Sequence, residues 1–253
     1  MKISIKRHTI EPEVHEEVIE YSVELEDVTL LQALTEIKTK HDATLSFESD
    51  CRSSVCGSCA MRVNGKEVLA CAHKVQEGDV IDPLKNMPII RDLVVDNSQA
   101  MAFNKSSHAW ASDVTNPQQP THDNALFNAL QSDCILCGSC YSACPVYSVN
   151  PEFKGPFALT RVWRYVSDVR EEDAQDKIEV IQNNGIWDCT LCNECVPVCP
   201  QGIAPKQDIT MLRNKSGMMG FMDPAFSNNF GGGGFDNNFG SFDGSPDFGA
   251  PQF

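Results

Sequence analysis

The stretch CTLCNECVPVCP (residues 189–200) spaces four cysteines as C-x2-C-x2-C-x3-C and ends on a proline. A near copy, CILCGSCYSACP, lies upstream at residues 134–145. Three cysteines at this spacing drift around the axis of a helix, so a loop wrapped around a compact centre holds them better. The proline after each run stops a helix from continuing through it. The repeat therefore predicts two similar cysteine loops, each enclosing a polynuclear centre.

Such a repeat is typical of bacterial-type ferredoxins with two four-iron clusters, in which the fourth cysteine of each run binds the other cluster. Crossing the runs assigns one 4Fe–4S cluster to Cys134, Cys137, Cys140 and Cys199. The second cluster then has the candidate ligands Cys144, Cys189, Cys192 and Cys195. Zinc sites and structural disulfides fit this eight-cysteine pattern poorly.

Cys192 decides the type of the second cluster, which is 4Fe–4S with this ligand and 3Fe–4S without it. Cys192 matches Cys137 in the upstream copy, and the following Asn193 matches Gly138. Asparagine is the non-glycine residue that best tolerates a left-handed backbone. We therefore predict that both loops wrap in the same way and that Cys192 is the fourth ligand.

A third cysteine group begins with CRSSVCGSC (residues 51–59). Its members are Cys51, Cys56 and Cys59, followed by Cys71. This C-x4-C-x2-C spacing with a later fourth cysteine is that of a plant-type 2Fe–2S cluster. Zinc is the alternative, but four-cysteine zinc sites usually use two C-x2-C knuckles on separate turns. The spacing therefore favours a two-iron centre.

The residues after this loop return the fourth cysteine to it. The Asn-Gly pair at 64–65 is a strong signal for a two-residue hairpin turn. Counting back from that turn places Cys59 opposite Ala70, and hence Cys71 beside the other three cysteines. Gly57 lacks a Cβ and is expected to let the backbone fold closely around the centre. The hairpin thus completes the four-cysteine site from local sequence alone.

The arrangement of elements predicts an α+β protein. Residues 2–7 and 18–25 alternate as strands, and residues 26–41 form an amphipathic helix that Asp27 or Thr29 can cap. With the cysteine loop and the hairpin, this is an N-terminal β-grasp, plant-type ferredoxin domain. An all-α, bacterial-type two-cluster ferredoxin domain follows. Its helices are expected at 121–131, 155–170, 173–185 and 204–217.

Composition places the boundaries between these parts. We assign residues 1–104 to the β-grasp domain, the polar residues 105–120 to a linker, and residues 121–216 to the helical domain. Residues 217–253 hold eight phenylalanines and nine glycines, but no lysine or arginine. Glycine at this density opposes a packed fold, so we predict a disordered Phe/Gly/Asn-rich tail. The tail is either solvated or a partner-docking segment anchored by phenylalanine.

The charge and the remaining motifs narrow the function. A formal net charge of −15 argues against nucleic acid and against direct binding to anionic lipid. No apolar run reaches the roughly 18 residues that span a bilayer, and MKISIKRHTI lacks the core of a signal peptide. Twelve cysteines in such a chain are expected to bind metal. With no catalytic triad or nucleotide motif, we expect no catalytic residues: the chain carries electrons.

In the order CRSSVCGSC, Cys71, CILCGSCYSACP and CTLCNECVPVCP, the chain resembles the iron–sulfur subunit of succinate dehydrogenase and fumarate reductase. The resemblance covers about residues 1–216, and LSFESDCRSSVCGSCAMRVNGKEVLAC (45–71) is especially close. It implies a partner subunit that contains FAD and interconverts succinate and fumarate. It also implies a membrane-associated, quinone-linked partner. The two-iron cluster would face the flavin, and the last cluster the quinone side.

Some residues depart from the better-known members of that family. Cys192 stands where an apolar residue is usual, and Thr190 stands where a histidine is common. Val146 and Val149 replace a serine and a tryptophan of the quinone pocket. These departures, and the tail, resemble a less common branch whose partner is a cysteine-rich subunit related to heterodisulfide reductases. In that branch, electrons reach menaquinone or a thiol/disulfide couple through this partner.

The resemblance implies an oxidoreductase subunit that is peripheral on the inner membrane, with the cytoplasmic face favoured. The alternative is the iron–sulfur subunit of a related flavin enzyme, such as a thiol-dependent fumarate reductase or a 2-hydroxy acid dehydrogenase. Turnover of succinate and fumarate by the complex distinguishes the two. A regulatory module with structural zinc would instead give a colourless protein.

Overall fold

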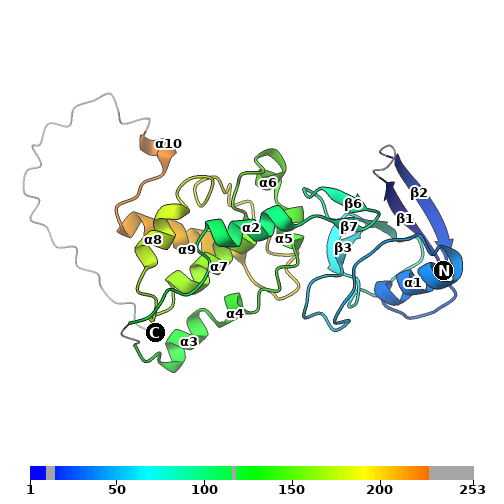
Figure 1. Ribbon diagram of the computed structural model, residues 1–253, viewed down its shortest axis with the longest axis horizontal. Coiled ribbons are helices and arrows are strands. Elements are labelled where there is room, and N and C mark those ends of the chain that lie inside the picture. Colours follow the sequence, from blue (N-terminus) through cyan, green and yellow to red (C-terminus); the bar gives the residue numbers. More distant parts are fainter. Residues whose placement is uncertain (10–14, 116–117, 228–253) are drawn as a thin grey trace, which may run out of the picture. The chain divides into compact units, whose positions relative to one another are not determined.

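The computed structural model describes residues 1–9, 15–115 and 118–227 (Figure 1). The chain divides into two compact units, Met1–Phe221 and Met222–Phe253. The described part of the second unit contains the short helix α10 (Pro224–Ser227). All twelve cysteines lie in the first unit.

The N-terminal part of the first unit is built on a five-stranded mixed sheet (Figure 1). Its strands are β1 (Lys2–Thr9), β2 (His15–Ser22), β3 (Ala60–Val63), β4 (Lys66–Leu69) and β5 (Val80–Asp82). Their order is β2-β1-β5-β3-β4, with β1 parallel to β5 and the other neighbours antiparallel. A small ribbon of β6 (Ile89–Arg91) and β7 (Val94–Val95) follows. This arrangement confirms the predicted β-grasp fold.

Helix α1 (Leu30–Glu36) packs its apolar face into the core beside this sheet and continues as a π-helical turn over Ile37–His41. Of the two predicted caps, Thr29 is the one used: its hydroxyl accepts from the Gln32 amide, and the Gln32 side chain accepts from Thr29 N. This reciprocal capping box satisfies two backbone donors at the helix start. The predicted apolar face is confirmed, since its leucines are fully or nearly fully buried.

The remainder of the first unit is helical. Its helices are α2 (Ser98–Ser106), α3 (His122–Phe127), α4 (Ala129–Ser132), α5 (Ser139–Ser142), α6 (Pro145–Val149), α7 (Pro156–Val166), α8 (Ala174–Val180) and α9 (Pro205–Met218). Helix α7 is central and packs against α2, α4, α5, α8 and α9. Its buried side chains include Leu159, Trp163 and Val166.

Two helix predictions are wrong in detail. The helix expected over 121–131 breaks at Asn128, whose buried amide donates to Arg164 O and Ser167 Oγ at 3.4 Å. The helix expected over 173–185 ends at Val180, and the residue beyond it with a left-handed backbone is Asn184, not the final Gly185. Gly185 is required for another reason, because a Cβ there would lie 2.0 Å from Ile181 O.

The helical part begins before the expected linker, since α2 packs against α7. Asn86 connects the sheet domain to the same part of the molecule: its amide donates to the carbonyls of Tyr141, Ser142 and Cys144 at 3.0–3.2 Å. Several hydrogen bonds from one half-buried side chain hold two packed elements in one mutual orientation. The β-grasp and helical regions therefore form one unit.

The predicted tail lies largely outside the described residues. Helix α9 extends to Met218, and α10 covers Pro224–Ser227, so residues 217–227 are described. The prediction for residues 228–253 falls on a segment outside the described residues. Within the described ranges, none of the helices combines the length and apolar character needed to cross a membrane.

Candidate iron–sulfur centres

The loop after the β-grasp helix brings the first four cysteines together. Ala70 N donates to Cys59 O at 3.0 Å, which confirms the predicted hairpin register and places Cys71 next to this pair. The Cys59 thiol interacts with that of Cys71, and the Cys51 thiol with that of Cys56. The four predicted two-iron ligands thus occupy one site at the edge of the sheet.

Backbone amides of this loop are directed at sulfur. Ser53 N lies 3.4 Å from Cys51 Sγ, and this amide, with that of Val55, lowers the pKa of Cys51 to about 6. Left-handed backbone at Arg52 and Ser54 turns the loop between them. Burial instead raises the pKa of Cys59 to about 11. Amides that stabilise a thiolate also stabilise a thiolate bound to iron, so the loop fits the donor set of a cluster.

Two further cavities are lined by cysteines, and the first contains residues of both C-terminal runs, 134–145 and 189–200. It is lined by Cys134, Cys137, Cys140 and Cys199. Thr160 of α7 and Pro205 of α9 complete its wall. Cys199 therefore lies with the first three cysteines of the upstream run, 59 or more residues away in the sequence, and not with the first three of its own run.

The second cavity has the complementary composition. It is lined by Cys144, Cys189, Cys192 and Cys195. Cys144 and Cys195 are buried and Cys189 is half-buried, whereas Cys192 is exposed. Val146 and Thr190, two of the departures from the better-known family members, also line this cavity. Among the described residues, no three Cys, His, Asp or Glu side chains form a group that could hold a single metal ion.

The two cysteine loops have nearly the same backbone. Gly138 has φ +80° and Asn193 has φ +77°, which confirms the predicted left-handed match. Leu136 and Leu191 form a second matched pair, with φ +55° and +56°. The sequence signal for this second pair is only that both copies carry leucine before the second cysteine, and leucine is not a residue that favours this conformation.

The left-handed leucines turn their amides toward sulfur. Leu191 N lies 3.4 Å from Cys189 Sγ, and the Leu136 amide makes the corresponding bond to Cys134. Burial raises the pKa of the Cys134 thiol to about 11, and the Leu136 amide opposes that rise. Each left-handed leucine costs about 1–2 kcal/mol in backbone strain. The hydrogen bond from its amide to a cysteine sulfur offsets this cost.

Arg213 on α9 was not identified from the sequence. Its guanidinium donates to the carbonyls of Ile186, Trp187 and Cys189 at 2.6–3.2 Å and stacks over the Trp187 ring at 5.4 Å. The positive charge also lowers the pKa of the Cys189 thiol, although burial raises it more. Arg213 therefore fixes the chain that enters the second cysteine cavity.

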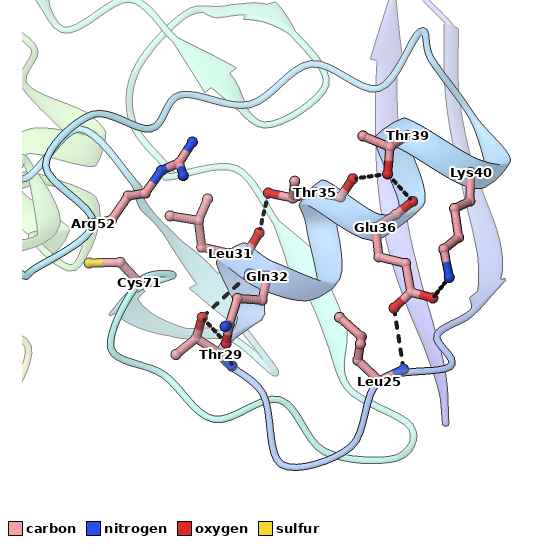
Figure 2. A pocket seen from close by; sticks show the side chains of 10 residues that line it. All are labelled: Leu25, Thr29, Leu31, Gln32, Thr35, Glu36, Thr39, Lys40, Arg52 and Cys71. Carbon is pink, nitrogen blue, oxygen red and sulfur yellow. Dashed lines mark hydrogen bonds and ion pairs between the residues drawn. The ribbon is translucent and has the colours of Figure 1, made fainter.

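An open groove of about 550 Å³ runs along α1 to the two-iron loop (Figure 2). Thr35 on α1 and Thr39 on the following π-helical turn line it, with Lys40 toward one end. Arg52 and Cys71 lie at the other end (Figure 2). One of the predicted two-iron ligands is therefore reached from this open face.

Gly57 brings the two-iron loop against the first cysteine cavity. A Cβ at Gly57, where φ is +76°, would lie 2.8 Å from Cys137 Cβ and 2.9 Å from Ile135 O. The sequence analysis expected Gly57 to make room for the two-iron centre. The atoms nearest to it instead belong to Ile135 and Cys137, in the upstream C-terminal cysteine run. Gln201 Nε2, which donates to Ser54 O at 3.1 Å, joins the same two regions.

Gly57→Ala is expected to separate these loops. Gly78 is the matched control, because its φ of +83° imposes the same left-handed strain, while no atom lies within 4 Å of its Cβ position. Gly78→Ala should cost about 1–2 kcal/mol, and Gly57→Ala more, because it adds a backbone clash. The measurements are urea unfolding and the rate of electron transfer between the centres. Equal losses in both variants would contradict the role of the contact.

The comparisons with known proteins agree with this layout. Residues 2–102 match a 2Fe–2S iron–sulfur cluster binding domain, and residues 131–203 match a 4Fe–4S dicluster domain. The fumarate reductase iron–sulfur subunit of Mycobacterium tuberculosis is 42% identical over 189 residues, covering 70% of this chain and 76% of that protein. The 8-methylmenaquinol:fumarate reductase iron–sulfur subunit of Wolinella succinogenes is 36% identical over 234 residues, covering 83% and 72%.

A solved chain of the Mycobacterium smegmatis Sdh1 complex in the apo form has the same fold. It matches with a TM-score of 0.75 and 22% identity, covering 86% of this chain and 95% of that one. In this chain, the 2Fe–2S cluster binding domain precedes the 4Fe–4S dicluster domain. The chain therefore belongs to the family of iron–sulfur subunits of fumarate reductases and succinate dehydrogenases.

Proposed function

We propose that this chain carries single electrons between an FAD-containing subunit that interconverts succinate and fumarate and a membrane-associated subunit. The observation that supports it most is the placement of the twelve cysteines: one four-cysteine loop and two four-cysteine cavities in a single compact unit. The contact between Gly57 and Cys137 brings the first two of these sites together. Short separations of this kind suit a relay of one-electron steps.

The cysteines suit three separate iron–sulfur clusters. The proposed 2Fe–2S ligands are Cys51, Cys56, Cys59 and Cys71. The proposed ligands of the first 4Fe–4S cluster are Cys134, Cys137, Cys140 and Cys199, and those of the second are Cys144, Cys189, Cys192 and Cys195. The support is the thiolate donor set together with the amides of Ser53, Leu136 and Leu191 at sulfur. When bound, such clusters supply one-electron carriers whose potentials depend on ligands, hydrogen bonds and burial.

The flavin side is proposed at the open groove along α1. Cys71 lies at its end and Arg52 lies beside it (Figure 2). A two-iron ligand that lines an open face gives a partner subunit close access to the centre. Purification of the complex and assay with succinate and fumarate tests this function directly. Turnover of a 2-hydroxy acid, or thiol-dependent fumarate reduction, would instead support a related flavin enzyme.

The acceptor side is proposed at the second cysteine cavity. Cys192 is exposed there. Val149, five residues after Cys144, has a side chain that is 83% exposed. The Wolinella relative is named for 8-methylmenaquinol, which favours a menaquinone-type quinone as the electron carrier on this side. Val146, Val149 and Thr190 replace the usual serine, tryptophan and histidine of the quinone side. We therefore infer that a cysteine-rich partner subunit passes the electrons on to the quinone. The complex would then be peripheral on the cytoplasmic face of the inner membrane.

Cys192→Ser tests the fourth ligand of the second cluster. Asn193 and Leu191 hold the same backbone as their upstream counterparts, so the loop geometry supports a 4Fe–4S cluster. The variant is expected to lose about one iron and to gain a three-iron EPR signal. The measurements are iron analysis, EPR and Mössbauer spectroscopy on anaerobically purified complex. A three-iron signal already present in the fresh wild type and unchanged by the substitution would exclude Cys192 as a ligand.

A further inference from the structure

Asp208 is a buried carboxylate at the junction of three helices. It lies in the first turn of α9 and is 2% exposed. Its two oxygens accept hydrogen bonds from Gln131 Nε2 on α4 and Thr160 Oγ1 on α7, both at 2.8 Å. Neither donor carries a charge. A buried carboxylate held only by neutral groups has a large desolvation cost in its ionised form.

No basic side chain of the described residues pairs with Asp208. The helices around it carry the basic groups Arg161 and Arg164 on α7, Lys177 on α8, and Lys206, Arg213 and Lys215 on α9, and the acidic groups Asp176 and Glu179 on α8, with Asp133 after α4. Arg164 pairs with Asp168, and Arg161 donates to Tyr165. Lys177 pairs with Glu171. Arg213 donates to backbone carbonyls, and Asp208 has no ion-pair partner among the described residues.

Burial accordingly raises the pKa of Asp208 to about 6, while the hydrogen bonds from Gln131 and Thr160 act in the opposite direction. The positive end of α9 also favours the carboxylate, because Asp208 lies in the first turn of this helix. Desolvation outweighs both effects. The group therefore changes its charge close to neutral pH, where an ordinary aspartate is fully ionised.

Gln131 and Thr160 can each form a hydrogen bond with Asp208 whether its carboxyl group is ionised or protonated. The Thr160 hydroxyl can donate or accept, and the Gln131 amide has an oxygen as well as a nitrogen. Gln131 Oε1 is buried and has no hydrogen-bond partner in the described part of the chain. Rotation of this amide would let a protonated Asp208 donate to Oε1. Gln131 itself is half-buried, so the carboxyl group lies one side chain from solvent.

Thr160 connects this carboxyl group to the first cysteine cavity. Thr160 lines that cavity together with its four cysteines, and its hydroxyl is 2.8 Å from Asp208 Oδ2. An electron added inside the cavity is a negative charge in a poorly screened interior. Such a charge raises the proton affinity of a nearby carboxylate, and the two sites then titrate as a coupled pair.

We propose that Asp208 is the proton acceptor for reduction of the first 4Fe–4S centre. As one electron arrives from the flavin side, the Asp208 carboxylate binds one proton from solvent and forms an O–H bond, so the local charge does not change. On reoxidation, the electron leaves toward the acceptor side and the proton returns to solvent. This inference rests on the proposed ligands Cys134, Cys137, Cys140 and Cys199.

The test is a redox titration of the cluster EPR signals at several pH values between 5 and 8, on wild-type complex and the Asp208→Asn variant. In the wild type, one 4Fe–4S potential should fall as pH rises above the value at which Asp208 loses its proton. The fall is up to about 59 mV for each tenfold decrease in proton concentration. In Asp208→Asn, that potential should stay at the low-pH value of the wild type, because asparagine mimics the neutral acid. Reduced-minus-oxidised infrared spectra should show a protonated carboxyl in the wild type only.

Asp173→Asn, at an exposed carboxylate before α8, is the matched control and should keep the wild-type pH dependence. A wild type in which every cluster potential is independent of pH would overturn the proposal, as would an unchanged slope in Asp208→Asn. Both results leave the clusters present and the proposed function intact. Absence of any 4Fe–4S signal in the wild type would instead overturn the ligand assignment, and this inference with it. The wild-type titration and infrared spectra decide the matter even if Asp208→Asn does not fold.

Discussion

Replacing Cys199 by serine is expected to remove the 4Fe–4S cluster of the upstream cysteine run, although Cys199 belongs to the downstream run. The reason is its position in the cavity that Cys134, Cys137 and Cys140 also line. Loss of a direct ligand should exceed the 10–100-fold effect of supporting residues, so electron transfer from succinate should fall by about 100-fold or more. The measurements are EPR of the purified complex and succinate-dependent reduction of a soluble acceptor.

Cys195→Ser is the matched control for this variant. Cys195 lies in the same run but lines the other cavity, with Cys144 and Cys189. It should therefore remove the second cluster and leave the signal of the first. Reduction of the two-iron centre by succinate should survive in both variants, because that centre has its own ligands. If Cys199→Ser and Cys195→Ser removed the same signal, each run would serve its own cluster and the crossed assignment would be wrong.

The features that could be predicted from the sequence are those set by short-range chemistry. The Asn-Gly turn at 64–65 fixes the β3–β4 register, and this register places Cys59 opposite Ala70. Asn193 takes the left-handed conformation of the glycine it replaces, because asparagine tolerates it. In each case the relevant neighbours lie within a few residues along the chain, so pattern and propensity are sufficient.

The features that escaped prediction depend on distant parts of the chain. Gly57 is required by the backbone at Cys137, and the break at Asn128 follows from carbonyl and hydroxyl acceptors on and after α7. Leu136 and Leu191 adopt a conformation that leucine disfavours, which a local propensity cannot anticipate. Asp208 lies in what appeared from the sequence to be an ordinary helix start. Only the packing of α9 against α7 shows that its carboxyl group is buried.

The β-grasp domain contains its own unusual buried charge cluster. Asp92 is fully buried and accepts from Arg7 Nε at 2.8 Å, from Arg7 Nη2 at 3.2 Å and from Ser46 N at 2.8 Å. Arg7 also pairs with Asp42, which accepts from Tyr21 Oη at 2.8 Å. Hydrogen bonds that Asp42 accepts from Thr44, Tyr21 and Arg7 outweigh its burial and hold the pKa of its carboxyl group well below the usual range. Its contribution to stability is thus present above the ordinary aspartate pKa and is lost as pH falls below it.

Asp92→Asn is expected to destabilise this domain by about 3–5 kcal/mol, because it leaves the Arg7 guanidinium buried with one carboxylate fewer. Asparagine keeps the shape of the side chain and tolerates the left-handed backbone at this position, where φ is +49°, so loss of charge is the main change. Urea unfolding followed by visible circular dichroism of the two-iron centre measures the effect. Glu20→Gln, in the exposed pair with Lys2, is the control and should cost less than about 1 kcal/mol. Equal, small losses in both variants would show that the buried pair only offsets its own desolvation. A large loss confined to Asp92→Asn would show that the charged network around Arg7 of β1 supports the domain that carries the two-iron centre.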